Sequence, residues 1–437
     1  MKVALRSASG SENKYNKRKI VLRKIIIAIF LLVIACLLAN TATAKIYIDI
    51  SSPSARRMPI AIEDFSGKEF SPLASSLIRR NLDLSGLFNI ISEVGEKEDS
   101  PFWLSAGAEA FIKGSISREK GDLLVEVFLY DLARNKTLLA KRYRGQESNI
   151  RTMAHRFSNE VIETLTGEKG IFETKIAFIS KKSGNKELYL MDFDGHNAKK
   201  LTNNGSINLS PKWSRDGKKL LFTSFKEGKA ALYIKDLASY NEVALTEEKH
   251  MTMGGDWSPD GRKVVFTMTR RGDSDLFLTE PGKTTIRRLT SGWGLDVSPA
   301  WAPDGNSIAF VSDRGGNPNI YKMTGRGEEL TRLTFEGKYN TSPAWSKDSK
   351  WIAYSSLQKG GFRIYIMQAD GSSKRQLTFG PGNDEDPSWS PDGRFVAFTS
   401  TRDGKKTIYI INVGSSKIMK LEGSGGADMS PTWSPFF

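Results

Sequence analysis

Polar residues recur at a fixed spacing in the carboxyl-terminal part of this sequence, and their side chains are suited to recognising a ligand. Each stands five residues before a tryptophan: Asn208, Thr252, Asp296, Asn340, Asp384 and Asp428. If the tryptophans lie on equivalent strands, these residues form a polar, partly acidic ring. The ring could recognise a partner loop, with a cation held by its three aspartates, or it could consist only of solvated loops with Asx-turns.

Apolar residues accompany this ring. Met251, Met253, Val297 and Met429 stand next to it, and exposed methionine suits an adaptable protein interface. We therefore predict a protein-binding rim. Its predicted residues are Asn208, Met251, Met253, Asp296, Asn340, Asp384, Glu385 and Asp428.

The residues that enzymes and metal sites need are sparse. The three histidines, His155, His196 and His250, stand in separate segments, and neither Gly-x-Ser-x-Gly nor His-Glu-x-x-His occurs. The Asp-Gly pairs that follow the tryptophans lack the alternating oxygen ligands of a calcium loop, and a tight turn explains them. We predict no catalytic residue, no metal site and no cofactor.

A repeat of 44 residues positions the ring. Trp213, Trp257, Trp301, Trp345, Trp389 and Trp433 keep this step, and series of Phe or Tyr and of Leu keep it too. Each unit has four short apolar runs separated by turn residues, as in Pro-x-Trp-Ser-x-Asp-Gly. A four-stranded sheet at this period is a β-propeller blade, and no segment of the repeat has the 3.6-residue period of a helical solenoid.

The turn chemistry predicts how the ring of blades closes. An Asp-Gly turn makes the tryptophan strand and the next strand antiparallel neighbours, and we place the tryptophan strand innermost. Ile176–Ser180 then lacks an inner strand, and Pro431–Ser434 is an inner strand without its neighbour. Together they complete one blade, which gives a six-bladed propeller with no open edge.

The residues before the propeller predict a small α/β domain. Helices are expected from Ser71 toward Leu84 and over Ile150–Leu165, with strands at 59–62, near 110–112, and over 123–129 and 138–143. The predicted organisation is a signal peptide over residues 1–44, an amino-terminal α/β domain over 45–168 and the propeller over 169–437.

The first 44 residues have the pattern of an export signal. Basic residues precede the apolar run Ile25–Leu38, and Ala42-Thr43-Ala44 suits cleavage before Lys45. An uncleaved anchor and a lipoprotein lipidated at Cys36, the only cysteine, are the alternatives. The leader carries eight basic residues against one acidic residue, so the net charge of +15 falls to +8 after cleavage. The remaining charge is spread along the chain, which argues against nucleic acid as a partner.

The whole pattern resembles the TolB family, the periplasmic propeller proteins of the Tol-Pal envelope system. The resemblance rests on the order of leader, α/β segment and Pro-x-Trp-Ser-Pro-Asp-Gly repeats, on Asp83-Leu84-Ser85-Gly86-Leu87-Phe88 and on Phe172–Phe178. It implies a periplasmic protein that supports outer-membrane integrity and constriction at cell division. It also implies two partners, the lipoprotein Pal at the propeller and the carboxyl-terminal domain of TolA at the mature amino terminus.

These implied partners can be placed on the sequence. The loops before the tryptophan strands lie at the propeller mouth opposite the Asp-Gly turns, so we expect Pal there and the amino-terminal domain on the Asp-Gly side. The strand predicted to meet TolA is Lys45, Ile46, Tyr47, Ile48, Asp49 and Ile50. This strand is either an edge of the small domain or a segment that a partner captures. We expect a monomer attached to the outer membrane through Pal; a glycan-binding propeller with an aromatic-rich channel is the alternative.

Overall fold

The computed structural model describes residues 56–437, apart from residues 68, 92–99 and 247–249. All of the described residues belong to one compact unit. The predicted leader and the predicted TolA-binding strand lie outside the described residues.

The first part of the described chain is a five-stranded sheet with helices. In order, its elements are β1 (Met58–Ile62), α2 (Ser71–Ser85), β2 (Phe88–Ile91), α3 (Ser100–Ser105), β3 (Ala110–Glu119), β4 (Asp122–Asp131), β5 (Lys136–Gly145), the 3₁₀ turn Glu147–Asn149 and α4 (Ile150–Thr166). The strand order is β2-β1-β3-β4-β5, with β1 parallel to both of its neighbours and β3, β4 and β5 antiparallel. The predicted α/β architecture is confirmed; β2 and α3 were not predicted.

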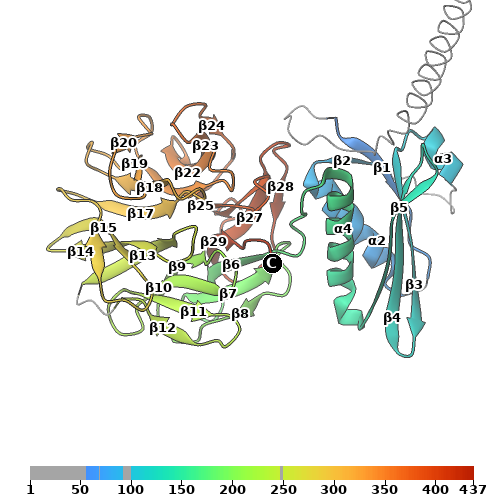
Figure 1. Cartoon of the computed structure of the whole chain (residues 1–437), viewed down its shortest axis with the longest axis horizontal. Helices are drawn as coiled ribbons and strands as arrows, with labels where there is room; N and C mark the ends of the chain where they lie inside the picture. The colour runs from blue at the N-terminus through green and yellow to red at the C-terminus, as the bar shows by residue number, and fades with distance from the viewer. Residues whose placement is uncertain (1–55, 68, 92–99, 247–249) are drawn as a thin grey trace, which may run out of the picture. The chain divides into compact units, whose positions relative to one another are not determined.

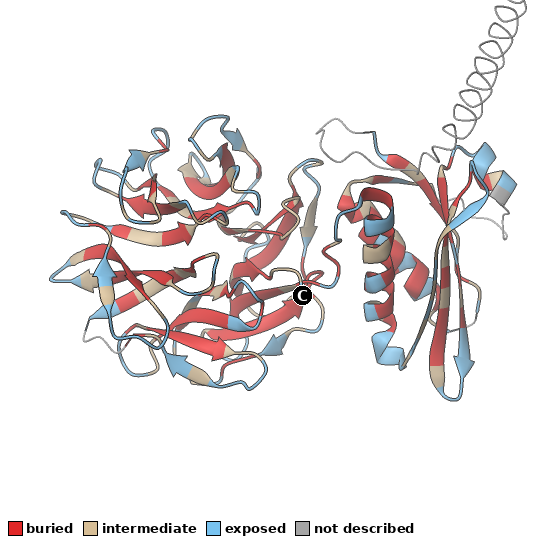
Figure 2. Cartoon of the chain, viewed as in Figure 1, coloured by how far each residue is buried: buried red, intermediate tan, exposed pale blue. Residues whose placement is uncertain are grey.

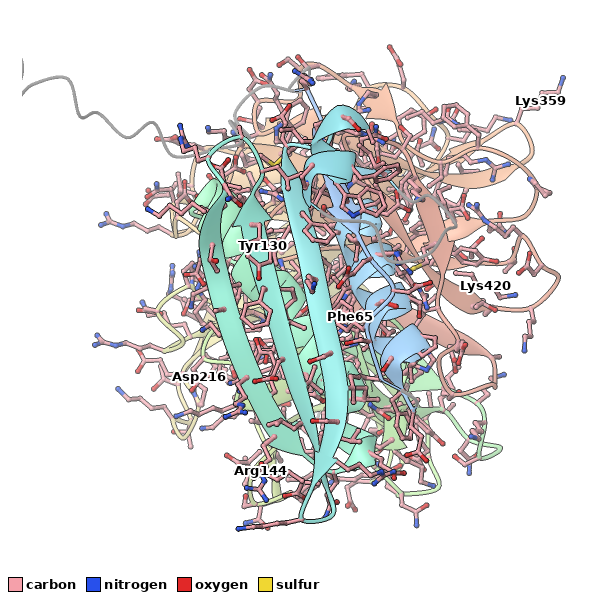
Figure 3. All side chains as sticks on the ribbon, turned by 90° about the vertical axis from the view of Figure 1, so that its right-hand side faces the viewer. Phe65, Tyr130, Arg144, Asp216, Lys359 and Lys420 are labelled. Carbon is pink, nitrogen blue, oxygen red and sulfur yellow. The ribbon has the colours of Figure 1, made fainter. Side chains whose placement is uncertain are left out.

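Helix α4 shows why the sequence pattern identified this part. Met153, Phe157, Val161 and Leu165 are buried at a spacing of four, and Gly167 ends the helix with a φ of 76°. Figure 1 shows α2 and α4 together on one side of the sheet. Tyr130 lies on the other face, where its ring centroid is 6.1 Å from that of Phe111 (Figure 3).

The second part is a six-bladed propeller whose sheets lie between residues 175 and 433 of the described chain (Figure 1). Its blades are β9 (Asn208–Trp213), β10 (Lys219–Ser224), β11 (Ala231–Asp236) and β12 (Glu242–Ala244); β13 (Met251–Trp257), β14 (Val264–Arg270), β15 (Asp273–Thr279) and β16 (Ile286–Arg288); β17 (Asp296–Trp301), β18 (Ser307–Ser312), β19 (Asn319–Thr324) and β20 (Thr331–Arg332); β21 (Asn340–Trp345), β22 (Trp351–Gln358), β23 (Gly361–Gln368) and β24 (Arg375–Gln376); β25 (Asp384–Trp389), β26 (Phe395–Ser400), β27 (Thr407–Asn412) and β28 (Ile418–Lys420); and β29 (Asp428–Trp433), β6 (Lys175–Ser180), β7 (Glu187–Asp192) and β8 (Lys199–Lys200). The second and third strands of each blade are almost wholly buried, and the fourth is the most exposed (Figure 2).

The last blade joins the two ends of the propeller, as the sequence predicted. Strand β29 pairs antiparallel with β6, with Asp428 opposite Ser180 and Trp433 opposite Ile176. The ladder is extended by the backbone N–H of Ser434, which donates to the carbonyl of Lys175 at 2.9 Å. The indole N–H of Trp433 also donates to the Thr174 hydroxyl at 2.8 Å. Strand β29 therefore protects an edge of β6 that would otherwise be free.

The tryptophans tie neighbouring blades together. The indole N–H of Trp345 donates to the carbonyl of Ala300 at 3.0 Å, and that of Trp389 donates to the carbonyl of Ala344 at 3.1 Å. Each acceptor lies on the inner strand of the preceding blade, 45 residues earlier. Because these two rings are buried, each adds apolar burial to a directional bond between blades. Trp301 differs, since its indole N–H donates to the carbonyl of Gly305 in its own blade at 3.3 Å.

The α/β part contacts the propeller at the turns that follow the third strands of two blades. Asn412 Nδ2 donates to the carbonyl of Ser85 at 3.2 Å. Asp194 is buried, and His155 Nε2 lies 3.3 Å from its Oδ2, which Arg151 also contacts. Burial alone would raise the pKa of Asp194, but the neighbouring His155 and Arg151 hold it well below its usual range. These turns are on the same side of the blades as the Asp-Gly turns.

Deletion of residues 429–437 should abolish the propeller's cooperative unfolding. It removes the inner strand of the closing blade and leaves β6 with an unpaired edge. Thermal unfolding followed by near-ultraviolet circular dichroism would measure this. A truncated protein that melts like the full chain would contradict the shared blade.

Candidate binding site at the channel mouth

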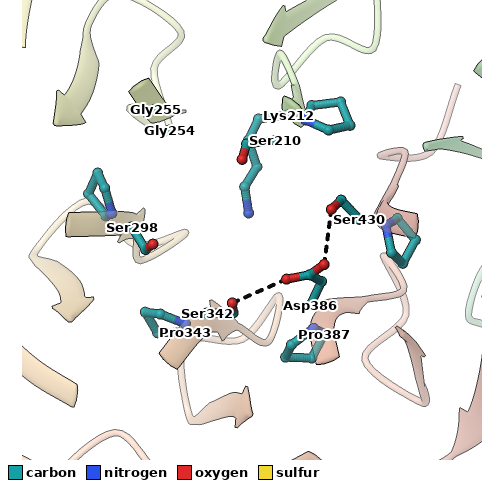
Figure 4. Close-up of a pocket in the computed structure, with 13 residues that line it drawn as sticks. Ser210, Lys212, Gly254, Gly255, Ser298, Ser342, Pro343, Asp386, Pro387 and Ser430 are labelled. Atoms are coloured by element: carbon teal, nitrogen blue, oxygen red, sulfur yellow. Dashed lines mark hydrogen bonds between the residues drawn. The ribbon is translucent and has the colours of Figure 1, made fainter. Parts of the chain in front are cut away.

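The six inner strands surround a central channel with a cavity of about 90 Å³ (Figure 4). The residue three positions before each tryptophan lines it and has a positive φ, from 47° to 55°. These residues are Ser210, Gly254, Ser298, Ser342, Asp386 and Ser430. The ladder shifts register at this position, so each inner strand has a bulge that turns a short side chain toward the channel.

In the described part of the chain, prolines and serines make up much of the channel lining, which also contains one cation, Lys212, and one carboxylate, Asp386. Asp386 accepts hydrogen bonds from Ser430 Oγ at 2.9 Å and from Ser342 Oγ at 3.3 Å, and the Lys212 side chain extends into the channel (Figure 4). Asp256 accepts the backbone N–H of Trp301 at 2.8 Å, and burial raises the pKa of its carboxyl, against the effect of Lys212. No aromatic side chain is among the cavity-lining residues, so the expectation of an aromatic-rich channel for a glycan was wrong.

The predicted polar ring is not exposed. Asp384 is 0% exposed, and both of its carboxylate oxygens accept hydrogen bonds from Arg402 Nη2 at 3.0 Å. Asp296 Oδ2 accepts a hydrogen bond from Arg314 Nη2 at 2.7 Å. Asp428 Oδ2 accepts a hydrogen bond from the backbone N–H of Ser424 at 2.8 Å. The amides Asn208 and Asn340 are likewise buried, in bonds to neighbouring loops. The expected exposed ring was wrong because these side chains brace the loops from inside, and its three aspartates do not converge on a cation.

The remaining predicted rim residues lie nearer the surface. Met251 is exposed and Met253 is partly buried. Glu385 is also partly buried; burial and the nearby carboxylate of Asp386 raise the pKa of its carboxyl. Within the described chain, no group of three or more potential metal ligands was found. Binding of a partner by the predicted residues remains a prediction.

Exposed apolar side chains lie one residue before four of the six buried ring positions. Four consecutive blades present large apolar side chains there, with exposed fractions from 39% to 45%. We call this set the mouth crescent; it consists of Ile207, Met251, Leu295 and Tyr339. Trp293, 93% exposed, stands in the same loop as Leu295. The 44-residue step that revealed the tryptophans also relates these four positions, and this signal was missed apart from Met251.

Two of the three histidines lie near the same carboxylate: His155 beside Asp194 Oδ2, and His196, whose backbone N–H donates to Asp194 Oδ1 at 3.4 Å. His155 is buried, His196 Nδ1 lies 3.4 Å from Glu422 Oε2, and His250 is exposed in the loop before β13. Among the described residues, the polar side-chain contacts of the histidines are with carboxylates and an amide, and include no serine or threonine hydroxyl that a histidine could activate. No helix among the described residues has the length and hydropathy needed to cross a membrane.

Comparison with known proteins places this chain in a family. The model of the TolB β-propeller domain matches residues 162–363 and 341–436, and the model of the TolB amino-terminal domain matches residues 46–138. The chain belongs to the TolB family.

Individual relatives agree with the family model. The chain is 37% identical over 205 residues to the Tol-Pal system protein TolB of Geobacter sulfurreducens and 39% identical over 207 residues to that of Syntrophotalea carbinolica. These matches cover 44% and 43% of this chain and 48% of each relative, so they span about half the length of the relatives. The crystal structure of TolB from Acinetobacter baumannii superimposes with a TM-score of 0.77 at 26% identity, covering 89% of this chain and 100% of that one.

The Asp384–Arg402 pair generates a prediction about stability. Asp384→Asn leaves the Arg402 guanidinium, whose side chain is 16% exposed, without its anionic partner. We expect a loss of about 3 kcal/mol in the free energy of unfolding, measured in urea, because an unpaired buried charge is costly. Asp403→Asn, in the exposed pair with Lys420 on the same blade, is the control and should change stability much less. Equal effects would contradict the bracing role.

Proposed function

We propose that this chain is a periplasmic protein-binding component of the Tol-Pal system and is not an enzyme. It binds the lipoprotein Pal at the propeller mouth and the carboxyl-terminal domain of TolA through its amino terminus. Through Pal it is held at the outer membrane, where it supports envelope integrity and constriction at division.

The observation that carries this proposal is the mouth crescent. Four large apolar side chains stand exposed at equivalent positions on neighbouring blades, beside a tryptophan that is almost fully exposed. Soluble proteins seldom leave apolar groups gathered in this way without a binding role, and aromatic anchors are typical of interface centres. The contacts of the α/β part lie on the side of the Asp-Gly turns, so they leave the crescent accessible.

The lining of the channel supports a surface interaction over a reaction inside it. A cavity of about 90 Å³ is small for a substrate, since ligand pockets are usually several hundred Å³. Its serine hydroxyls and single carboxylate have no histidine among the lining residues to activate them. The loops at the mouth are held by the buried Asp384 and Asp296 pairs, which gives a partner a preformed surface.

A double variant of the crescent tests Pal binding. Ile207→Glu with Leu295→Glu places two charges in the apolar surface, and we expect the affinity for Pal of the same organism to fall at least tenfold, about 1.4 kcal/mol. Isothermal titration calorimetry on residues 45–437 would measure it. Val243→Glu, on the outer strand β12 at 58% exposure, is the control and should bind normally. Normal binding by the double variant would move the Pal site elsewhere; binding of peptidoglycan fragments in place of Pal would favour the glycan-binding alternative.

The amino terminus generates a separate prediction. Deleting residues 45–50 should abolish capture of the TolA carboxyl-terminal domain in a pull-down and leave Pal binding unchanged, because β-strand capture uses the main chain of that segment. Retained capture of TolA by the shortened chain would place the TolA site elsewhere.

A further inference from the structure

The two blades outside the mouth crescent carry a group of lysines at the mouth. At the crescent position these blades have Asn383 and Ala427 in place of a large apolar residue. Five lysines stand on the adjoining hairpins, and we call them the lysine cluster: Lys181, Lys182, Lys186, Lys405 and Lys406. The hairpins of the crescent blades also carry exposed basic residues, Lys229, Arg271 and Lys359, but the lysine cluster stands on the two blades that lack a large apolar residue at the crescent position.

Backbone bonds fix the lysine cluster next to the inner strands. The N–H of Lys181 donates to the carbonyl of Ala427 at 3.1 Å, and the carbonyl of Lys406 accepts from Asp428 at 3.0 Å. The carbonyl of Lys186, on the same hairpin as Lys181, accepts from the backbone N–H of Asn208 on the next blade at 2.9 Å. Asn208 follows Ile207, the first residue of the crescent, so Lys186 lies next to one end of the crescent.

The charge of the cluster is largely uncompensated. Lys406 has the one carboxylate contact of the cluster within the described residues, a distance of 3.9 Å from Nζ to Glu385 Oε2. Arg402, on the same hairpin as Lys405, is committed to Asp384, and the exposed Asp403 is committed to Lys420. Burial lowers the pKa of Lys186, and the positive charges of Lys181 and Lys406 lower it further, against Asp386. These ammonium groups repel one another in the free protein.

We propose that the mouth recognises an acidic segment of its protein partner, with apolar or aromatic side chains seated on the mouth crescent and Asp or Glu side chains on the lysine cluster. This rests on the proposed function. The aspartates are satisfied internally, and lysines are the accessible charges. Partner carboxylates relieve the repulsion among the lysines, so opposite charges steer association and fix the register of the segment.

The substitutions Lys181→Glu and Lys186→Glu test this together. Neither side chain has a hydrogen bond or ion pair in the described chain, so folding should survive; a melting curve checks it. The control is Lys218→Glu with Lys350→Glu, two exposed positions in the turns on the opposite side that make the same change in net charge. Pal of the same organism is the first probe, titrated at 50 and 300 mM salt.

We expect the Lys181/Lys186 variant to bind Pal at least tenfold more weakly at low salt, with a smaller loss at high salt, and the control to stay within twofold of the wild type. An equal loss in both variants, or tighter binding by the Lys181/Lys186 variant, overturns the inference while leaving Pal binding itself intact.

A second probe separates this inference from the proposed function. It is a pair of synthetic twelve-residue peptides with the same Trp and Leu residues, one flanked by Glu and one by Lys. If wild type binds no Pal, the proposed function fails. The inference still holds if the acidic peptide binds the wild type and binds the Lys181/Lys186 variant more weakly. Preference for the lysine peptide, binding of neither peptide, or binding only to phosphatidylglycerol vesicles overturns it.

Discussion

The antiparallel pairing of β29 with β6 is the constraint on which the rest of the propeller depends. Five blades are continuous in the chain, and each buries its broad faces against neighbours. The ring has no free side only because the last described strand supplies the inner strand of the first three. Closure fixes how many inner strands surround the channel, and therefore its width and the spacing of loops around its mouth. Any surface formed by several blades requires this closure.

Inside the closed ring, the inner strands depart from regular β geometry where they line the channel. The bulge at Ser298 and its equivalents puts non-glycine residues at positive φ, which costs free energy at each site. Short polar side chains keep the cost low, and the following proline lacks an N–H that the shifted ladder would leave without a partner. The result is a narrow channel lined by serines and prolines. Large surfaces suited to recognition occur where the strands emerge at the mouth.

At the mouth, buried polar side chains stabilise the loops, and apolar side chains form the exposed surface. Buried acids such as Asp296 and Asp384 hold arginines and so hold the loops, while the residues one position earlier meet solvent. Rigid loops reduce the entropy lost when a partner docks. Because these acids are paired inside the blades, they contribute little to the surface charge, whereas the lysine cluster contributes accessible positive charge. Family membership and this division together favour a protein partner over a small substrate.

The sequence by itself determined the fold. A 44-residue step in Trp, Phe and Leu fixed four strands per blade, and an unpaired strand at each end, Ile176–Ser180 and Pro431–Ser434, fixed the shared blade. Helices α2 and α4 followed from apolar spacing, whereas β2 was missed because four residues carry too little periodicity. Only the tertiary structure decided which side chains of the rim are exposed to solvent and which are buried. A shift of one residue along a strand reverses the direction of a side chain, and the arginines that bury Asp296 and Asp384 lie 18 residues further on in the chain. The sequence pattern shows that a position recurs, but burial depends on a neighbour that only folding brings close.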